Sequence, residues 1–549
     1  MRRHRVYPQL THVDEHGYSF LHKLLAAGNS ISVPAKPYVG LLAPPVQLAL
    51  ASTLIVHPPD TTKTHSTERL KGSDAALRYL RCVHNTIEGP AYKSVRRAFT
   101  FPEKSIRRRA PAQRAGTLTP SPTAAGNDID RLGTEAANSQ SIWQRAEDFW
   151  HVVGWALNCS ILHKKRWERW KLWLDITLDF IEADWEECLR QCQLGLTERD
   201  GTLEDSLLWQ YISEHGRQEP NIGGTRRRIV KAILAAGDAK SLEQFPEIWV
   251  KETEGPKVQN NDKSYVGTVN FETGELGDYA SDIEDDIMYD APRASTRRKI
   301  KDVTDASLPP LDNSAIPDYE SAVERLGGME AVLLRQRLIA LLVQAATHLP
   351  NQFTGLSGLF DNLTEHFNHL PVSMLSVLIT TSQLSNYDQL TFNVDLIIPL
   401  SSGQYPDYTK TIPVQEHFEQ ILLPNRAPTQ SFAANAKLSI VLEQMFLYMM
   451  KEKLFKPTDN LRAAVEKGIE ERHKVFGTAR GKKRNAEEEK HGQLLMEASS
   501  ERLLSLLEIL EISAGKAPRP RSEKKSILLS SFTSSLSSLP QSGTEDDAD

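Results

Sequence analysis

Residues 156–194 contain neither glycine nor proline, although the 549-residue chain holds 30 of each. The segment KKRWERWKLWLDITLDFIEADWEEC, residues 164–188, carries four of the nine tryptophans. Because glycine and proline disfavour helix interiors most strongly, their absence predicts one or two long helices here. A long helix with so many aromatic residues needs neighbours to cover it, which constrains the chain towards a helical fold.

A helical wheel of residues 164–188 separates two apolar faces from one polar strip. One face consists of Trp167, Trp170, Leu174, Leu178, Ile181, Trp185 and Cys188, and the far side carries Trp173, Ile176 and Phe180 with Leu172 and Ala183. The strip between them consists of Lys164, Glu168, Lys171, Asp175, Asp179, Glu182 and Glu186. Since an exposed acidic strip repels phosphate, we interpret the tryptophans as core residues rather than a base-stacking surface. Trp167 and Trp173 stay open as anchors for a protein partner.

The fold predicted from the sequence is mainly α, with helical-bundle or irregular α-solenoid blocks joined by long disordered linkers. Helical spacing of apolar residues predicts an N-terminal helical region at 1–100, a Trp-rich helical domain at 141–250 and a C-terminal helical domain at 314–512. The segment 370–402 mixes β-branched residues with short apolar runs. We assign it to helix because its neighbours are helical.

Three polar stretches are expected to be disordered, since they offer too little apolar surface to offset the entropy of ordering. They are a basic linker at 101–140, an acidic-then-basic linker at 251–313 and a Ser-rich tail at 513–549. Within them, Thr119 and Ser121 precede prolines and Ser281 precedes acidic residues. These three hydroxyls are candidate phosphorylation sites, where added charge would change a docking contact.

Composition and motifs exclude several classes of protein. Four cysteines are too few for a disulfide framework in a chain of this length, so we expect a reducing compartment. The longest apolar run, 41–56, contains two prolines and falls short of the ~20 residues that span a bilayer, so no membrane association is expected. Cys159 with His163 and Cys188 with Cys192 lie roughly 35 Å apart if one helix joins them, too far for one metal. We therefore expect no metal, no cofactor, no catalytic residue and no small-molecule substrate.

Basic clusters are the most informative polar feature. Three short runs lie in polar segments and suit nuclear import or phosphate contact. They are Arg107, Arg108 and Arg109, then Arg297, Arg298 and Lys299, and finally Lys482, Lys483 and Arg484. A further set within 223–231, consisting of Arg226, Arg227, Arg228 and Lys231, is a candidate nucleic-acid contact together with segment 93–114.

The leading hypothesis is a non-enzymatic nuclear scaffold or adaptor subunit of a larger complex, associated with chromatin or nucleic acid. Its partners would be the other proteins of that complex. The alternative is direct nucleic-acid binding through 93–114 and 223–231. A third hypothesis is an enzyme whose cleft is assembled from residues distant in sequence.

Overall fold

The computed structural model describes residues 15–31, 42–102, 132–195, 203–213, 222–256, 319–401, 413–475 and 483–517. Within these ranges the chain forms α-helices with a few 3₁₀ and π turns, and no β-strand. The predicted mainly α fold is confirmed. The ambiguous segment is helical too, as α15 (Val372–Thr380) and α16 (Asn386–Leu400). The central parts of both predicted linkers, 103–131 and 257–318, and most of the predicted tail lie outside the described residues.

The helices before residue 196 are α1 (Glu15–Ile31), α2 (Pro45–Val56), α3 (Thr67–Thr86), α4 (Tyr92–Ala98), α6 (Ile142–Arg145), α7 (Phe149–Leu162) and α8 (Lys164–Gln193). They are followed by α9 (Leu207–Ile212), α10 (Ile222–Ile233) and α11 (Ala239–Gln244). The long glycine- and proline-free stretch is therefore the end of α7 plus α8, a helix of 30 residues.

The remaining helices are α12 (Tyr319–Arg325), α13 (Met329–His348), α14 (Leu356–Phe367), α15, α16, α17 (Gln415–His417), α18 (Phe432–Lys451), α19 (Asp459–His473) and α20 (Lys483–Ser513). A π turn, η7 (Phe418–Leu422), follows α17 directly. Local sequence sets several of the starts, because a side-chain oxygen accepts a hydrogen bond from an unpaired N–H of the first turn. Asp148, Ser385, Ser431 and Thr458 serve in this way for α7, α16, α18 and α19.

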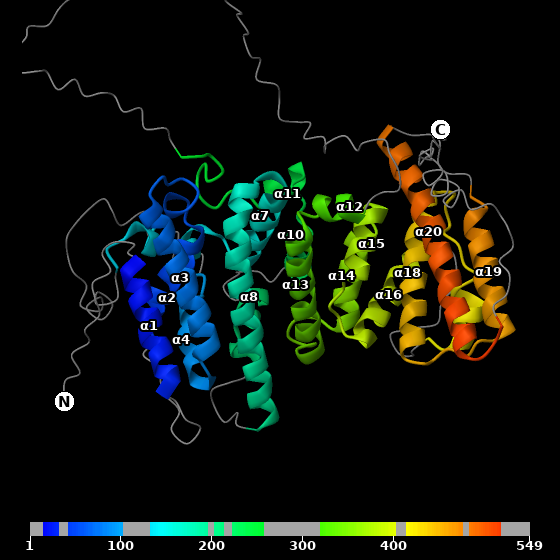
Figure 1. Ribbon diagram of the computed structural model, residues 1–549, viewed down its shortest axis with the longest axis horizontal. Helices are drawn as coiled ribbons and strands as arrows, with labels where there is room; N and C mark the ends of the chain where they lie inside the picture. The colour runs from blue at the N-terminus through cyan, green and yellow to red at the C-terminus, as the bar shows by residue number, and fades with distance from the viewer. Residues whose placement is uncertain are drawn as a thin grey trace, which may run out of the picture.

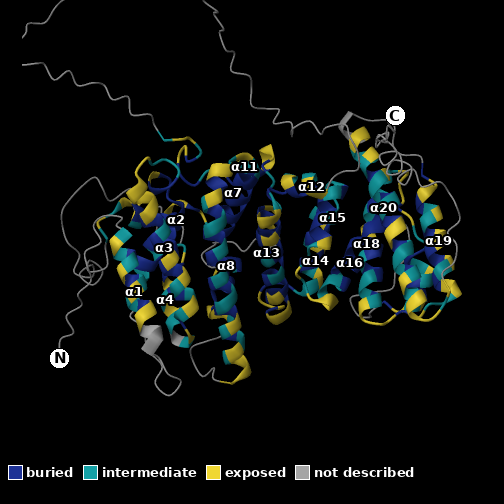
Figure 2. Ribbon diagram, viewed as in Figure 1, coloured by how far each residue is buried: buried dark blue, intermediate teal, exposed yellow. Residues whose placement is uncertain are grey.

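The helices stand side by side along the long axis of the molecule, and the chain advances from α1 at one end to α19 and α20 at the other (Figure 1). Helix α8 contacts α2, α3, α7, α9 and α13. Helix α10 contacts α7 on one side and α13 and α14 on the other. Buried residues lie between the helices and exposed residues on the outer faces and ends, as Figure 2 shows. This arrangement is an irregular helical array rather than a set of separated bundles.

One continuous cluster of buried apolar side chains runs through the described residues, from Tyr18 in α1 to Leu507 in α20. The helices of the segments 141–250 and 314–512 share this cluster through the α8–α13 and α10–α14 contacts. The division of the chain into these two domains stays a prediction from the sequence. The structure adds that their described helices pack against each other.

The folded part of the Trp-rich region extends beyond its predicted limits. Residues 132–140, assigned to the first linker, include a 3₁₀ turn with Ala136 buried. Residues 251–256, assigned to the second linker, include Glu252, which is buried and bonded to α8. The polar composition of residues 251–256 predicted a linker. The sequence does not show that Glu252 is buried and paired with Arg166.

Helix α7 approaches the segment after α11 so closely that only glycine fits at position 154. A Cβ added to Gly154 would lie 2.3 Å from Cγ of Phe245, whose side chain is fully buried. At Gly133 an added Cβ would meet nothing within 4 Å.

We expect Gly154→Ala to destabilise the protein by ~1–3 kcal/mol, because the buried ring cannot move away without disturbing its neighbours. The measurement is the midpoint of urea unfolding followed by tryptophan fluorescence. Gly133→Ala is the matched control and should leave the midpoint unchanged. An unchanged midpoint for Gly154→Ala would contradict the close contact between α7 and Phe245.

Candidate functional site

The two tryptophans proposed as partner anchors are inside the protein. Trp167 is 3% exposed and Trp173 is 0% exposed. Nε1 of Trp173 donates to Oγ of Ser52 on α2 at 3.0 Å, and its ring lies 5.9 Å from that of Trp143. The anchor hypothesis is therefore corrected: both rings are buried in the core, and α2 and α6 cover the face of α8 that carries Trp173.

Two of the four basic residues proposed as nucleic-acid contacts are used within the fold. Arg226 donates to the backbone oxygen of Phe353 and stacks on its ring at 5.9 Å. Arg228 forms ion pairs with Asp148 and, at 3.2 Å, with Glu147. The charges of Arg226 and Arg228 thus join α10 to its neighbours rather than facing solvent.

The other two basic residues of α10 are exposed. Arg227 is paired weakly with Glu365 of α14 at 3.7 Å, and both side chains are more than half exposed. Lys231 is exposed as well. Of the segment 93–114, the described part presents exposed Lys93 and Arg97 on α4. Among the described residues, the exposed basic side chains of these two segments are therefore fewer than the sequence suggested, while residues 103–114 lie outside the described part.

The side chains of the remaining sites predicted from the sequence are not described by the structure. Lys483 and Arg484 begin helix α20. The others lie outside the described residues: Arg107, Arg108, Arg109, Arg297, Arg298, Lys299 and Lys482, and the candidate phosphorylation sites Thr119, Ser121 and Ser281.

The middle of the acidic strip of α8 faces α13, whereas Glu168 and Glu186 are exposed to solvent. Arg337 of α13 lies among three carboxylates of the strip. Its Nε bonds Glu182 at 2.9 Å, Nη1 bonds Asp175 at 2.9 Å and Nη2 bonds Asp179 at 2.7 Å. Lys171 of α8 extends the same contact by pairing with Glu330 at 2.9 Å. We call this α8–α13 contact the charged seam.

Electrostatics of the charged seam favour the ionised arginine. Burial lowers the pKa of Arg337, but hydrogen bonds and charges from Glu182 and Asp179 outweigh it, so the pKa is raised above its ordinary value. Burial and the neighbouring Asp179 raise the pKa of Asp175, against the opposing effect of Arg337. The helical wheel of α8 identified these carboxylates as one strip. Their partner Arg337 lies in RQRLIALL, residues 335–342, where the sequence gives no indication that it pairs with α8.

A second arginine of α13 holds backbone oxygens instead of carboxylates. Arg335 is fully buried and donates to the carbonyls of Ile233, Leu326 and Ala235 at 2.9, 2.6 and 2.8 Å. Two of these oxygens lie at and just beyond the C-terminal end of α10, where the helix dipole favours a cation. Burial lowers the pKa of Arg335 to about 9. Arg335 thereby fixes the end of α10 against α12 and α13.

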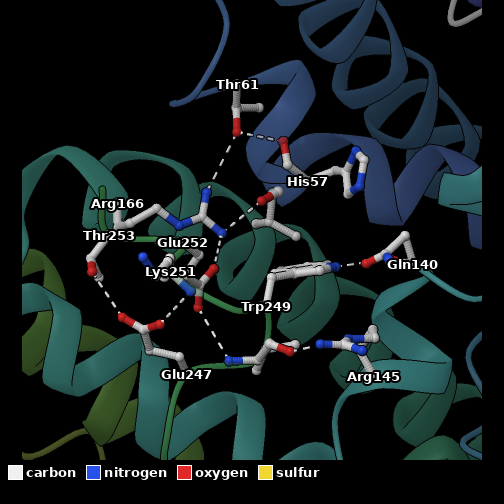
Figure 3. Close-up of polar contacts among 12 residues, drawn as sticks. His57, Thr61, Gln140, Arg145, Arg166, Glu247, Trp249, Lys251, Glu252 and Thr253 are labelled. Atoms are coloured by element: carbon white, nitrogen blue, oxygen red, sulfur yellow. Dashed lines mark hydrogen bonds and ion pairs between the residues drawn. The ribbon is translucent and has the colours of Figure 1, made fainter. Parts of the chain in front are cut away.

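A buried ion pair lies at the opposite side of α8, between Arg166 and Glu252 (Figure 3). Nη2 of Arg166 lies 2.5 Å from Oε2 of Glu252 and donates to the backbone oxygen of Val56 at 2.7 Å. The guanidinium also lies 5.2 Å from the ring centre of Trp170 and 5.8 Å from that of Trp249. Arg166 thus joins α8, the end of α2 and the segment after α11 in one contact, which we call the Arg166 centre.

The segment that contains Glu252 is held at several further points. Nε1 of Trp249 donates to the backbone oxygen of Gln140 at 2.9 Å, and Arg145 donates to that of Ile248 at 3.3 Å (Figure 3). Burial raises the pKa of Glu252, while the charge and hydrogen bond of Arg166 oppose this shift. Because both partners are buried and bonded to other groups, we interpret the centre as a structural cross-link. An Arg and a Glu 86 positions apart gave no signal in the sequence.

Among the described residues, no group of three or more His, Cys, Asp or Glu side chains is placed to hold a metal ion. Cys159 and Cys188 are buried thiols and Cys192 is exposed. None of the described helices combines the length and the apolar character needed to cross a membrane.

No protein-family model, no curated protein and no solved structure matches this chain.

We expect Glu252→Leu to destabilise the protein by ~3–5 kcal/mol, because it leaves the Arg166 guanidinium buried without a carboxylate. The double variant Arg166→Met with Glu252→Leu should recover most of this loss, since neither charge is then buried. The measurement is urea unfolding followed by the fluorescence of Trp170 and Trp249. Glu254→Ala is the control, because it removes an exposed pair with Lys251. A double variant no more stable than Glu252→Leu would argue against a buried pair.

For the charged seam, we expect Arg337→Ala to lower the free energy of unfolding by ~1–2 kcal/mol at low salt. This is less than the loss of fully buried charged hydrogen bonds would cost, because the carboxylates are partly exposed. The difference from wild type should shrink between 50 mM and 1 M NaCl as salt screens the charges. The stability of Arg337→Lys should lie between those of wild type and Arg337→Ala, since an ammonium cannot bond three carboxylates in fork geometry. Thermal unfolding measures each effect. Arg69→Ala, which removes an exposed arginine 3.8 Å from Asp60, is the control. A salt-independent difference would count against the seam.

Proposed function

We propose that this chain is a non-enzymatic scaffold or adaptor subunit of a larger nuclear assembly. The observation that carries the proposal is the elongated array of helices with one continuous core (Figure 1). An array of side-by-side helices presents a large surface relative to its volume, and such surfaces bind extended partners. The basic runs at 107–109, 297–299 and 482–484 support nuclear import.

The described polar side chains support a structural role for the interior. Arg166, Arg335 and Arg337 each connect helices that are distant in sequence. Cross-links of this kind give an extended molecule a defined shape, because they join successive helices at points where apolar contact alone permits sliding. A fixed shape is what a subunit needs to hold partners at set positions.

Direct nucleic-acid binding is the second candidate. Exposed Arg227 and Lys231 on α10 and exposed Lys93 and Arg97 on α4 support it. The pairing of Arg226 and Arg228 within the fold weakens it, because those charges already have acceptors. We therefore rank direct binding below association with chromatin through protein partners.

We expect the endogenously tagged chain, purified from nuclei and treated with nuclease, to form particles well above the 61.6 kDa mass of one chain. Mass photometry is the measurement, because it reports mass independently of the elongated shape. Co-purifying proteins should be present in whole-number ratios to the chain. Particles that fall to the mass of one chain only after nuclease treatment would favour the nucleic-acid candidate. A single chain without nuclease, or a chain absent from nuclei, would contradict the proposal.

A further inference from the structure

Exposed apolar side chains gather at one end of the C-terminal helices. Tyr387 in α16, Val414 before α17, Leu454 after α18, and Ile509 and Ile512 in α20 are each between 46% and 56% exposed. Large apolar patches on a protein surface mark interaction sites more often than single exposed residues do. We call these five residues the end surface.

Hydrogen bonds to residues 452–457 bring the helix ends of this surface together. Asn386, next to Tyr387, donates to Glu452 at 2.9 Å. Gln415, next to Val414, donates to the backbone oxygen of Lys456 at 2.8 Å. Lys516, one turn after Ile512, donates to the backbone oxygen of Pro457 at 2.6 Å. The loop after α18 and the C-terminal end of α20 accordingly lie at the same end of the array in Figures 1 and 2.

Leu454 is displayed from a fixed turn. Lys453 has φ +56°, and the N–H of Leu454 bonds the backbone oxygen of Met449 at 2.9 Å. The next residue, Phe455, is buried, with its ring 4.6 Å from that of Phe446. A helix end with this backbone usually carries glycine and turns its following apolar residue inwards. Here a lysine takes the position and Leu454 faces outwards.

Lysines outnumber acids next to Leu454 in the chain, where Glu452 is exposed but accepts a hydrogen bond from Asn386. Lys451, Lys453 and Lys456 are all exposed and lie within three residues of it. The end surface therefore fits a ligand that combines an apolar stripe with acidic residues.

The C-terminal part of this chain has that pattern. Leu528, Phe532, Leu536 and Leu539 fall within an arc of about 80° on a helical wheel, and serines occupy most of the intervening positions. The chain then ends in EDDAD, residues 545–549. Between Ala517 and Leu528 the chain extends at most about 36 Å, and it starts from Lys516 at the edge of the end surface.

We propose that residues 526–549 bind the end surface of the same chain. The apolar stripe from Leu528 to Leu539 covers Leu454 and its apolar neighbours, and the acidic terminus lies near Lys451, Lys453 and Lys456. Covalent attachment through a short connection gives an effective concentration in the millimolar range, so a weak contact suffices to hold the tail. The proposal is independent of the scaffold function.

The test uses a fluorescein-labelled peptide of residues 518–549 and the full-length chain. In wild type the native tail competes with the peptide. The variant Phe532→Asp with Leu536→Asp frees the end surface, so it should bind the peptide with a Kd at least ~10-fold lower than wild type does. Fluorescence anisotropy measures both affinities.

Adding Leu454→Ser to that double variant should weaken peptide binding at least ~10-fold. Leu333→Ser is the matched control, because Leu333 is an exposed leucine on α13, away from the end surface. Leu454 is exposed, so its replacement should leave the thermal midpoint unchanged, which separates lost binding from lost folding. Replacing Lys451, Lys453 and Lys456 with glutamate should also weaken binding.

Equal peptide affinity for wild type and the Phe532→Asp, Leu536→Asp variant would overturn the proposal, as would binding insensitive to Leu454→Ser. A wild-type dimer in mass photometry that dissociates in the tail variant would place the tail on a second copy. That outcome would contradict binding within one chain.

Discussion

Covering a 30-residue helix that is apolar on two faces requires neighbours on both sides, and helix α8 imposes this requirement on the chain around it. Trp170, Trp173 and Trp185 are fully buried. Helices α2, α6 and α7 and the segment after α11 supply their surroundings, while α13 covers the middle of the acidic strip. The position of α8 in the array thus links the N-terminal helices to those that follow residue 319.

Buried arginines connect segments of the array that are distant in sequence. A guanidinium in a protein interior is costly unless its N–H groups have acceptors, and the acceptors found here come from other segments of the chain. Within the described residues, Nε of Arg166 and both Nε and Nη2 of Arg472 are buried without an acceptor. Arg166 has a carboxylate and a carbonyl, Arg335 has three carbonyls, and Arg472 bonds the carbonyls of Leu423 and Asn425. Because each arginine fits only one arrangement of its acceptors, these contacts fix the order and spacing of helices that apolar packing would leave less defined. A defined, extended shape is what the proposed scaffold function would require.

The tryptophans and the basic clusters illustrate how the sequence can indicate chemistry without indicating location. Trp167 and Trp173 had the residue type of a binding anchor, yet both are buried, because neighbouring segments cover the two apolar faces of α8 on which they lie. Arg226 and Arg228 had the spacing of a phosphate-binding surface, yet they pair with groups 127 and 80 positions away. Side chains with strong interactions are used inside this fold as readily as outside it.

Periodicity and the distribution of glycine and proline determined, from the sequence alone, that the chain is mainly helical and that residues 164–188 form a covered helix. Both properties are local, since helix propensity and the 3.6-residue repeat depend on neighbours in the chain. Tertiary structure alone decided which groups meet: Arg166 with Glu252, Arg337 with the strip of α8, and Leu454 exposed beside three lysines. These outcomes depend on contacts between segments tens to more than a hundred residues apart, and no local pattern encodes which acceptor a given arginine reaches.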